Sequence, residues 1–259
     1  MRVRSPKVFA GVLMFGLLLC ASSTAYADAF SLTSFSFNNL QFTASAGTAQ
    51  FTVTAAVANA QAGMLGGPQN NMISSTFPIA QASAVVNQIT AAATANAATH
   101  SVSAETTAFL SGCSCSAGSF GQGILNGTLV LSGVEGPVTV NISGLRTLLL
   151  QVTTDAFGKY AESGLFMDLF VNGTPVFSLQ VEALHPLLGP NLSTMLQGSE
   201  QISRNITLQG GSTNSISLRL SATSLVINEV PEPASVVLLV SGLGFMTGVL
   251  KKRRKKIDQ

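Results

Sequence analysis

The sequence predicts an all-β protein, an antiparallel β-sandwich of a jelly-roll-like kind, with a signal-peptide helix before it and a transmembrane helix after it. Three observations predict the sandwich. Short segments alternate apolar and polar side chains with a period of two, as strands with one buried face do. Turn residues separate these segments at short intervals. The 259-residue chain is 46% apolar and 9% charged, which suits one compact core and excludes charge-driven disorder.

The N-terminus has the three parts of a secretory signal peptide. Three basic residues lie within the first seven positions, an uncharged apolar run covers 8–21, and a small-residue pattern ends at Ala27. This order is typical of a cleaved export signal. We expect cleavage between Ala27 and Asp28, so that residues 1–27 are removed on export.

The body is expected to span residues 28–229 and to consist of strands. The first clear strand is 50–57, where Phe51, Val53, Ala55 and Val57 are expected to share one face. Seven further segments with similar alternation are predicted strands: 127–132, 138–142, 148–152, 165–171, 176–181, 202–208 and 215–220.

Residues 79–104 contain ten Ala among 26 residues, and helix propensity alone would favour a helix. The apolar residues from Ile89 to Ala97 nevertheless alternate with polar ones, so we predict a strand. A break near Asn87 would let the earlier alternation change face.

Glycine and asparagine mark the predicted connections. Asn172-Gly173 suits a tight hairpin turn, because both central positions of such a turn favour positive φ. Further reversals are expected at 133–136 and at 210–211. Residues 63–78 are predicted to be a loop, and 184–198 an irregular connection with a short helical turn.

Cys113 and Cys115 are expected to form a disulfide in the mature protein, because export leads to an oxidising compartment. Metal binding is the alternative. It lacks a second pair of ligands, since only His100 and His185 could add imidazoles. We therefore expect no metal and no cofactor.

Catalytic motifs are weak in this chain. Asp155, Glu162 and Asp168 could supply the paired carboxylates that glycoside hydrolysis needs, about 5–10 Å apart. Their positions before a turn, in a polar connection and within a strand explain them better than catalysis does. Neither histidine lies in a motif that would activate a nucleophile. We predict that the protein is not an enzyme.

A carbohydrate-binding module is the main alternative function. Sugar rings are usually held by exposed aromatic side chains. The chain has no Trp, and Tyr160 is the one Tyr left after signal removal, while most Phe residues of the body are expected in the core. Recognition would then depend on Asn, Gln, Ser and Thr side chains.

The C-terminal 29 residues combine three features. Pro231, Glu232 and Pro233 form an extended, accessible tripeptide, and 234–250 is an uncharged run about 25 Å long as a helix, near the minimum for a bilayer span. A basic cluster follows directly: Lys251, Lys252, Arg253, Arg254, Lys255 and Lys256. Basic flanks stay in the cytoplasm, so the body is expected outside.

In this order and position, residues 230–259 resemble a PEP-CTERM sorting signal. The resemblance implies a bacterial envelope protein, exported by the general secretory machinery and held briefly in the inner membrane. An exosortase would then cut it near the tripeptide. Such proteins are associated with exopolysaccharide and biofilm, so exopolysaccharide is a candidate partner.

Charge supports export and excludes nucleic acid. The precursor has 13 basic and 11 acidic residues, but the body from 28 to 230 keeps 4 basic and 9 acidic ones, a net charge of −5. Nucleic-acid binding has no basic surface to use. We expect a structural or adhesive component of the cell surface or extracellular matrix.

Overall fold

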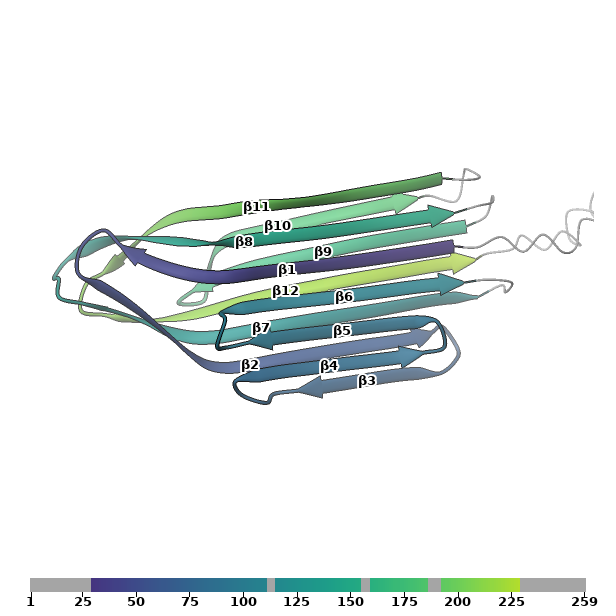
Figure 1. The fold of residues 1–259 in the computed structure, drawn as a ribbon, viewed down its shortest axis with the longest axis horizontal. Helices are drawn as coiled ribbons and strands as arrows, with labels where there is room; N and C mark the ends of the chain where they lie inside the picture. Colours follow the sequence, from purple (N-terminus) through teal and green to yellow (C-terminus); the bar gives the residue numbers. More distant parts are fainter. Residues whose placement is uncertain (1–28, 111–114, 155–158, 186–191, 229–259) are drawn as a thin grey trace, which may run out of the picture.

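The computed structural model describes residues 29–110, 115–154, 159–185 and 192–228. These residues form twelve strands in two antiparallel six-stranded sheets (Figure 1). The protein is therefore all-β, and its sheets pack as a β-sandwich, in agreement with the sequence prediction. Within these ranges, no helix has the length and hydropathy of a membrane span. The predicted signal-peptide and transmembrane helices lie outside the described residues.

Sheet A has the strand order β11-β8-β1-β6-β5-β4. Its strands, in chain order, are β1 (Ala29–Ala44), β4 (Ile79–Val86), β5 (Ile89–Asn96), β6 (Ser101–Leu110), β8 (Pro137–Thr154) and β11 (Leu192–Gln209).

Sheet B has the strand order β10-β9-β12-β7-β2-β3. Its strands are β2 (Thr48–Met64), β3 (Gln69–Ser74), β7 (Ser116–Ser132), β9 (Lys159–Val171), β10 (Thr174–His185) and β12 (Thr213–Asn228).

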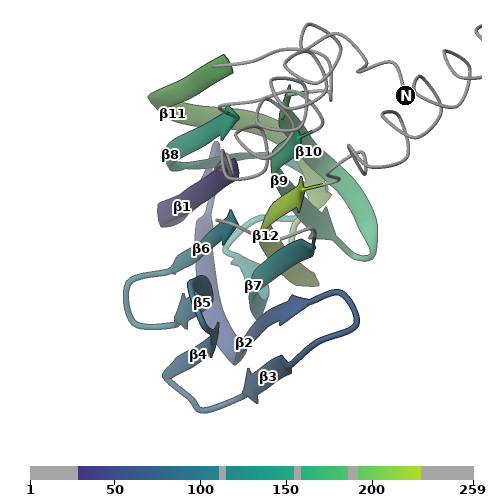
Figure 2. The same cartoon turned by 90° about the vertical axis from the view of Figure 1, so that its right-hand side faces the viewer.

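The two sheets lie face to face with their strands roughly aligned, and Figure 2 shows the two layers from one end. β1 packs on β12, β6 packs on β7, and β4 packs on β2. Each strand therefore has one inner face, toward the other sheet, and one outer face.

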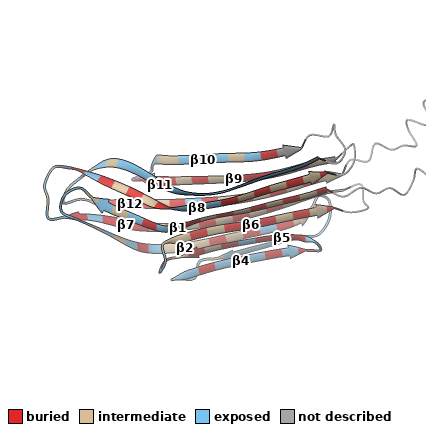
Figure 3. Ribbon diagram, turned by 45° about the horizontal axis from the view of Figure 1, so that its top comes forward, coloured by how far each residue is buried: buried red, intermediate tan, exposed pale blue. Residues whose placement is uncertain are grey.

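The core fills the space between the sheets, and buried positions alternate along most strands (Figure 3). The central strands supply its large side chains, including Phe35 and Phe37 of β1, Leu165 of β9 and Leu218 of β12, all at most 2% exposed. Burying such side chains contributes about 2 kcal/mol each, which is why the alternation predicts the fold well.

Alanine replaces these large side chains where β2, β4 and β5 pack. Ala82 and Ala93 are buried there, and on β7 a Cβ added at Gly123 would lie 2.3 Å from Cγ1 of Val102. The sheets approach too closely for anything larger. This packing explains how an Ala-rich segment can form strands in spite of its helix propensity.

The predicted strand character of 79–104 is confirmed, with a difference at Asn87. Asn87 has a φ of 53°, and Val86 pairs with Ile89 across a two-residue turn. The break therefore reverses the chain into a β4–β5 hairpin, and does not merely change the buried face. β6 begins at Ser101, after a second reversal.

β2 contains a bulge that the sequence prediction missed. Its register with β7 shifts between Val53 and Ala55. Val53 is buried, but beyond the bulge the buried residues are Ala56, Ala58, Ala60 and Ala62. The prediction that Val53, Ala55 and Val57 share a face is therefore wrong.

The predicted hairpin turn at Asn172-Gly173 is confirmed, with φ values of 52° and 77°. The predicted reversals at 133–136 and 210–211 also occur, and Gly133, Gly136 and Gly211 have positive φ. Both of these reversals carry the chain from one sheet to the other.

The sequence prediction misses two strands, and it makes one connection too long. β1 was not predicted, and β3 lies inside the predicted loop 63–78. The predicted irregular connection 184–198 overlaps two strands, since β10 continues to His185 and β11 begins at Leu192.

Candidate functional site

An open groove crosses the outer face of sheet B near the ends of its strands. It has a volume of about 760 Å³ and is lined by residues of β9, β12, β7, β2 and β3. Four spacings between neighbouring strands amount to about 19 Å. The groove is therefore long enough for a short chain of sugar rings.

Two paired glycines form part of the groove floor. Gly63 of β2 is the register partner of Gly118 of β7, and Leu225 of β12 pairs with Gly118 on the other side. Neither glycine adds a side chain to the outer face, so the sheet surface is depressed over β2 and β7 at this register. A Cβ at Gly118 would lie 3.6 Å from Cδ1 of Leu225, an ordinary contact.

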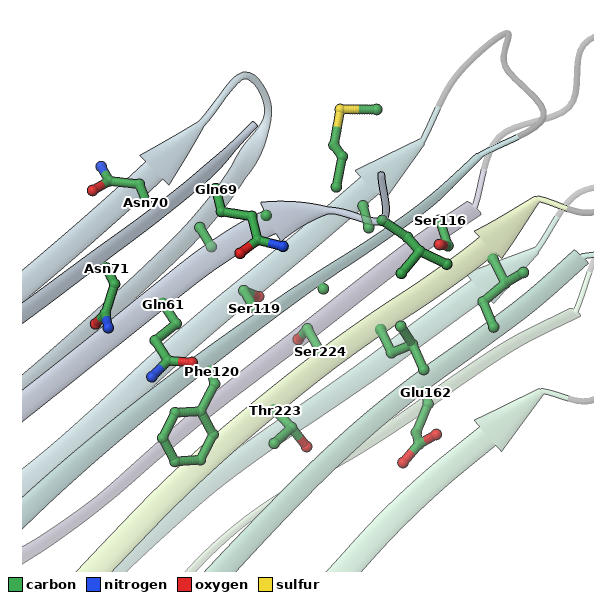
Figure 4. A pocket seen from close by; sticks show the side chains of 18 of the residues that line it. Gln61, Gln69, Asn70, Asn71, Ser116, Ser119, Phe120, Glu162, Thr223 and Ser224 are labelled. Atoms are coloured by element: carbon green, nitrogen blue, oxygen red, sulfur yellow. The ribbon is translucent and has the colours of Figure 1, made fainter. Parts of the chain in front are cut away.

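A row of side chains follows the next register along one side of this floor. Gln61, Phe120 and Thr223 are register partners on β2, β7 and β12, as Figure 4 shows. Phe166 of β9 also lines the groove. The row combines an aromatic ring with an amide and a hydroxyl, the groups that hold sugar rings in proteins.

Free amides lie at the β2–β3 end of the groove. The side chains of Gln61, Gln69 and Asn71 are exposed, and within the described residues none of them makes a hydrogen bond to another protein group. Each can donate and accept hydrogen bonds. They are therefore available to ligand hydroxyls without breaking an existing interaction.

The β9 end of the groove is acidic. The Tyr160 hydroxyl donates a hydrogen bond to the Glu162 carboxylate. Burial, this hydrogen bond and the negative charges of Glu162 and Glu182 raise the pKa of Tyr160 to about 12. Tyr160 thus stays neutral at physiological pH and holds the Glu162 carboxylate in place.

Buried hydroxyl groups attach the groove strands to sheet A. Ser31 of β1 donates to the backbone carbonyl of Glu162, and Thr33 donates to the carbonyl of Thr223 at 2.7 Å. Ser119 of β7 donates to the carbonyl of Thr107 at 2.9 Å. These bonds satisfy polar groups inside the sandwich and fix the backbone beneath the groove.

A second, smaller hollow of about 510 Å³ lies farther along the same face. Arg219 lies over the Phe170 ring there, with its guanidinium carbon 5.4 Å from the ring centre. Asp168 is nearby and accepts a hydrogen bond from Ser178 at 2.7 Å.

The carboxylates singled out in the sequence do not form a pair. Glu162 and Asp168 lie on the same outer face of β9, but six residues of strand separate them by about 20 Å. This separation exceeds what cleavage of one glycosidic bond requires. Asp155 lies outside the described residues.

The histidines and cysteines considered as metal ligands do not gather at one site among the described residues. The His100 ring packs edge-on against Phe51, with ring centres 5.3 Å apart, and His185 is the last residue of β10. No group of three metal-ligating side chains occurs among the residues the structure covers. Cys115 is disulfide-bonded. Cys113 lies outside the described residues, so its pairing with Cys115 stays a prediction.

The predicted sorting residues all lie outside the described residues. They are the cleavage pair Ala27 and Asp28, the tripeptide Pro231, Glu232 and Pro233, and the basic cluster 251–256.

The structure corrects the expectation that most Phe residues are in the core. Among the described Phe residues, Phe35 and Phe37 are buried and three more are partly buried against the core, whereas Phe120 and Phe166 line the groove. The signal was present in the sequence, because Phe120 shares one alternation with Gly118, whereas the opposite alternation carries only small residues from Ala117 to Gly123. The pairing of Gly63 with Gly118 depends on the register of β2 against β7, and no local sequence pattern predicts that register.

Comparisons with protein families, curated proteins and solved structures found no match to this chain.

Proposed function

We propose that the chain is an exported bacterial protein of the cell surface or extracellular matrix, where it is a non-enzymatic structural or adhesive component that binds exopolysaccharide. In this proposal the β-sandwich is a carbohydrate-binding module, and its binding of exopolysaccharide provides the adhesion. The sandwich would be jelly-roll-like, because the chain passes repeatedly between the sheets.

The single observation that carries this proposal is the groove on sheet B. Its glycine floor, its Phe120 ring and its unused amides provide apolar contact and hydrogen bonding in a shape that suits a glycan chain. The wide separation of Glu162 and Asp168 favours binding over hydrolysis. A glycan-active enzyme is the least supported alternative.

Localisation is proposed from the termini. The signal peptide would direct export, the helix 234–250 would hold the precursor in the inner membrane, and an exosortase would release the mature body. The body's net charge of −5 gives no support to a nucleic-acid partner.

Two experiments test the proposal. Mass spectrometry of the protein from its host should give a chain that starts at Asp28 and ends near Pro233, and an intact 259-residue chain would contradict the sorting claim. Retention on the host's own exopolysaccharide should be saturable. Loss of polymer length during that assay would instead indicate an enzyme, and no retention would contradict the glycan-binding claim.

A further inference from the structure

The charge around the groove restricts the glycans that it can hold. Among the described residues that line it, Glu162 is the one ionisable side chain, and none is Lys or Arg. On the β2–β3 side, the whole segment 29–104 contains no Asp, Glu, Lys or Arg. The groove is therefore neutral over most of its length and acidic at one end.

Hydrogen bonds fix the position of Glu162 at the acidic end of the groove. Tyr160 donates a hydrogen bond to the Glu162 side chain, and Ser31 donates to the Glu162 backbone carbonyl from inside the sandwich. Glu182 lies on the neighbouring strand β10, close enough to act electrostatically on Tyr160. A ligand carboxylate placed here would meet like charge, and among the described lining residues no cationic side chain offsets it.

The remaining groups suit an uncharged ligand. Gln61, Gln69 and Asn71 can exchange hydrogen bonds with hydroxyl or acetamido groups, and Phe120 offers apolar surface to a ring face. The Thr223 hydroxyl donates to the carbonyl of Gly164 at 3.3 Å and can still accept a hydrogen bond from a ligand. Since the groove crosses five strands, the ligand would lie across the strands and occupy several sites at once.

We propose that the groove binds an uncharged glycan chain, built from neutral hexoses or N-acetylated amino sugars, and that Glu162 excludes polymers with acidic groups. This inference rests on the proposed glycan-binding function and adds the chemical class of the glycan.

The test uses the exported protein purified from its host and two oligosaccharides of equal length, one of neutral hexoses and one of uronic acids. Calorimetry at low salt should give saturable binding of the neutral chain. The uronic-acid chain should bind at least about tenfold more weakly. Added salt should reduce the difference, because it screens the repulsion from Glu162.

Glu162→Gln should also reduce the difference in affinity between the neutral and the uronic-acid chain. The amide keeps an acceptor for the Tyr160 hydroxyl but removes the negative charge. Glu200→Gln is the matched control, since Glu200 pairs with Arg146 on sheet A. Both variants should unfold at the wild-type temperature. Equal or tighter binding of the uronic-acid chain by the wild type would overturn the inference alone, as would an unchanged difference in Glu162→Gln. Failure of every glycan to bind would overturn the proposed function as well.

Discussion

Gly63 of β2 and Gly118 of β7 are register partners on the outer face of sheet B. Because neither has a side chain, the sheet surface is depressed where most outer positions of β7 carry side chains. The same strand has Gly121 and Gly123 on its inner face, where sheet A approaches closely. Glycine in β7 therefore has two different functions, which substitution can separate.

Gly123→Ala should destabilise the fold by about 2 kcal/mol, because the new methyl group would overlap Val102 and approach the carbonyl of Thr94. Gly118→Ala is the control on the same strand. Its Cβ has ordinary van der Waals space, so its stability should equal or exceed that of the wild type. Urea unfolding of the exported protein measures both. Equal stability of the two variants would contradict the close packing of the sheets.

Thr33→Val should cost about 2 kcal/mol in unfolding free energy. The substitution keeps the shape but removes the hydroxyl that donates to the Thr223 carbonyl and contacts Ser163. Thr90→Val is the control, since Thr90 is exposed and bonds Thr107 on the outer face of sheet A. Its effect should stay within about 0.5 kcal/mol. A comparable loss in both variants would show that the buried hydroxyl has no special contribution.

Tyr160 should titrate near pH 12 in the folded protein, as measured by tyrosinate absorbance of the chain without residues 1–27. A folded pKa above the unfolded value of 10.0 means that the folded state binds the proton more tightly. Its contribution to stability is therefore complete below pH 10 and is lost as pH rises toward 12.

Glu162→Gln should lower the pKa of Tyr160 only in part, because burial, the largest cause of the shift, remains. Titration of the wild type at pH 10 would contradict the description of the acidic end of the groove.

The sequence predicts the strands whose inner faces carry large or alternating apolar groups, because burial energy depends on those faces. It predicts the Asn172-Gly173 hairpin for a local reason, the positive φ of both residues. It fails at β1, where the inner face includes the polar residues Ser31 and Thr33, which are buried because they bond the other sheet.

The groove itself could not be predicted from the sequence. Its floor depends on the register of β2 against β7, and the bulge between Val53 and Ala55 changes that register. The sequence singled out Glu162 as a possible partner of Asp155 and Asp168. The fold instead places it beside Tyr160 at the end of the groove.

Binding of a neutral oligosaccharide by Gly118→Leu, compared with the wild type and with Gly198→Leu, tests whether the groove on sheet B holds the glycan. Leucine at 118 would fill the groove floor, whereas Gly198 lies on edge strand β11 of the other sheet with open space around it. Calorimetry should show at least about a tenfold loss of affinity in Gly118→Leu and wild-type affinity in Gly198→Leu. Wild-type affinity in Gly118→Leu, with the fold intact, would show that the groove does not bind the glycan.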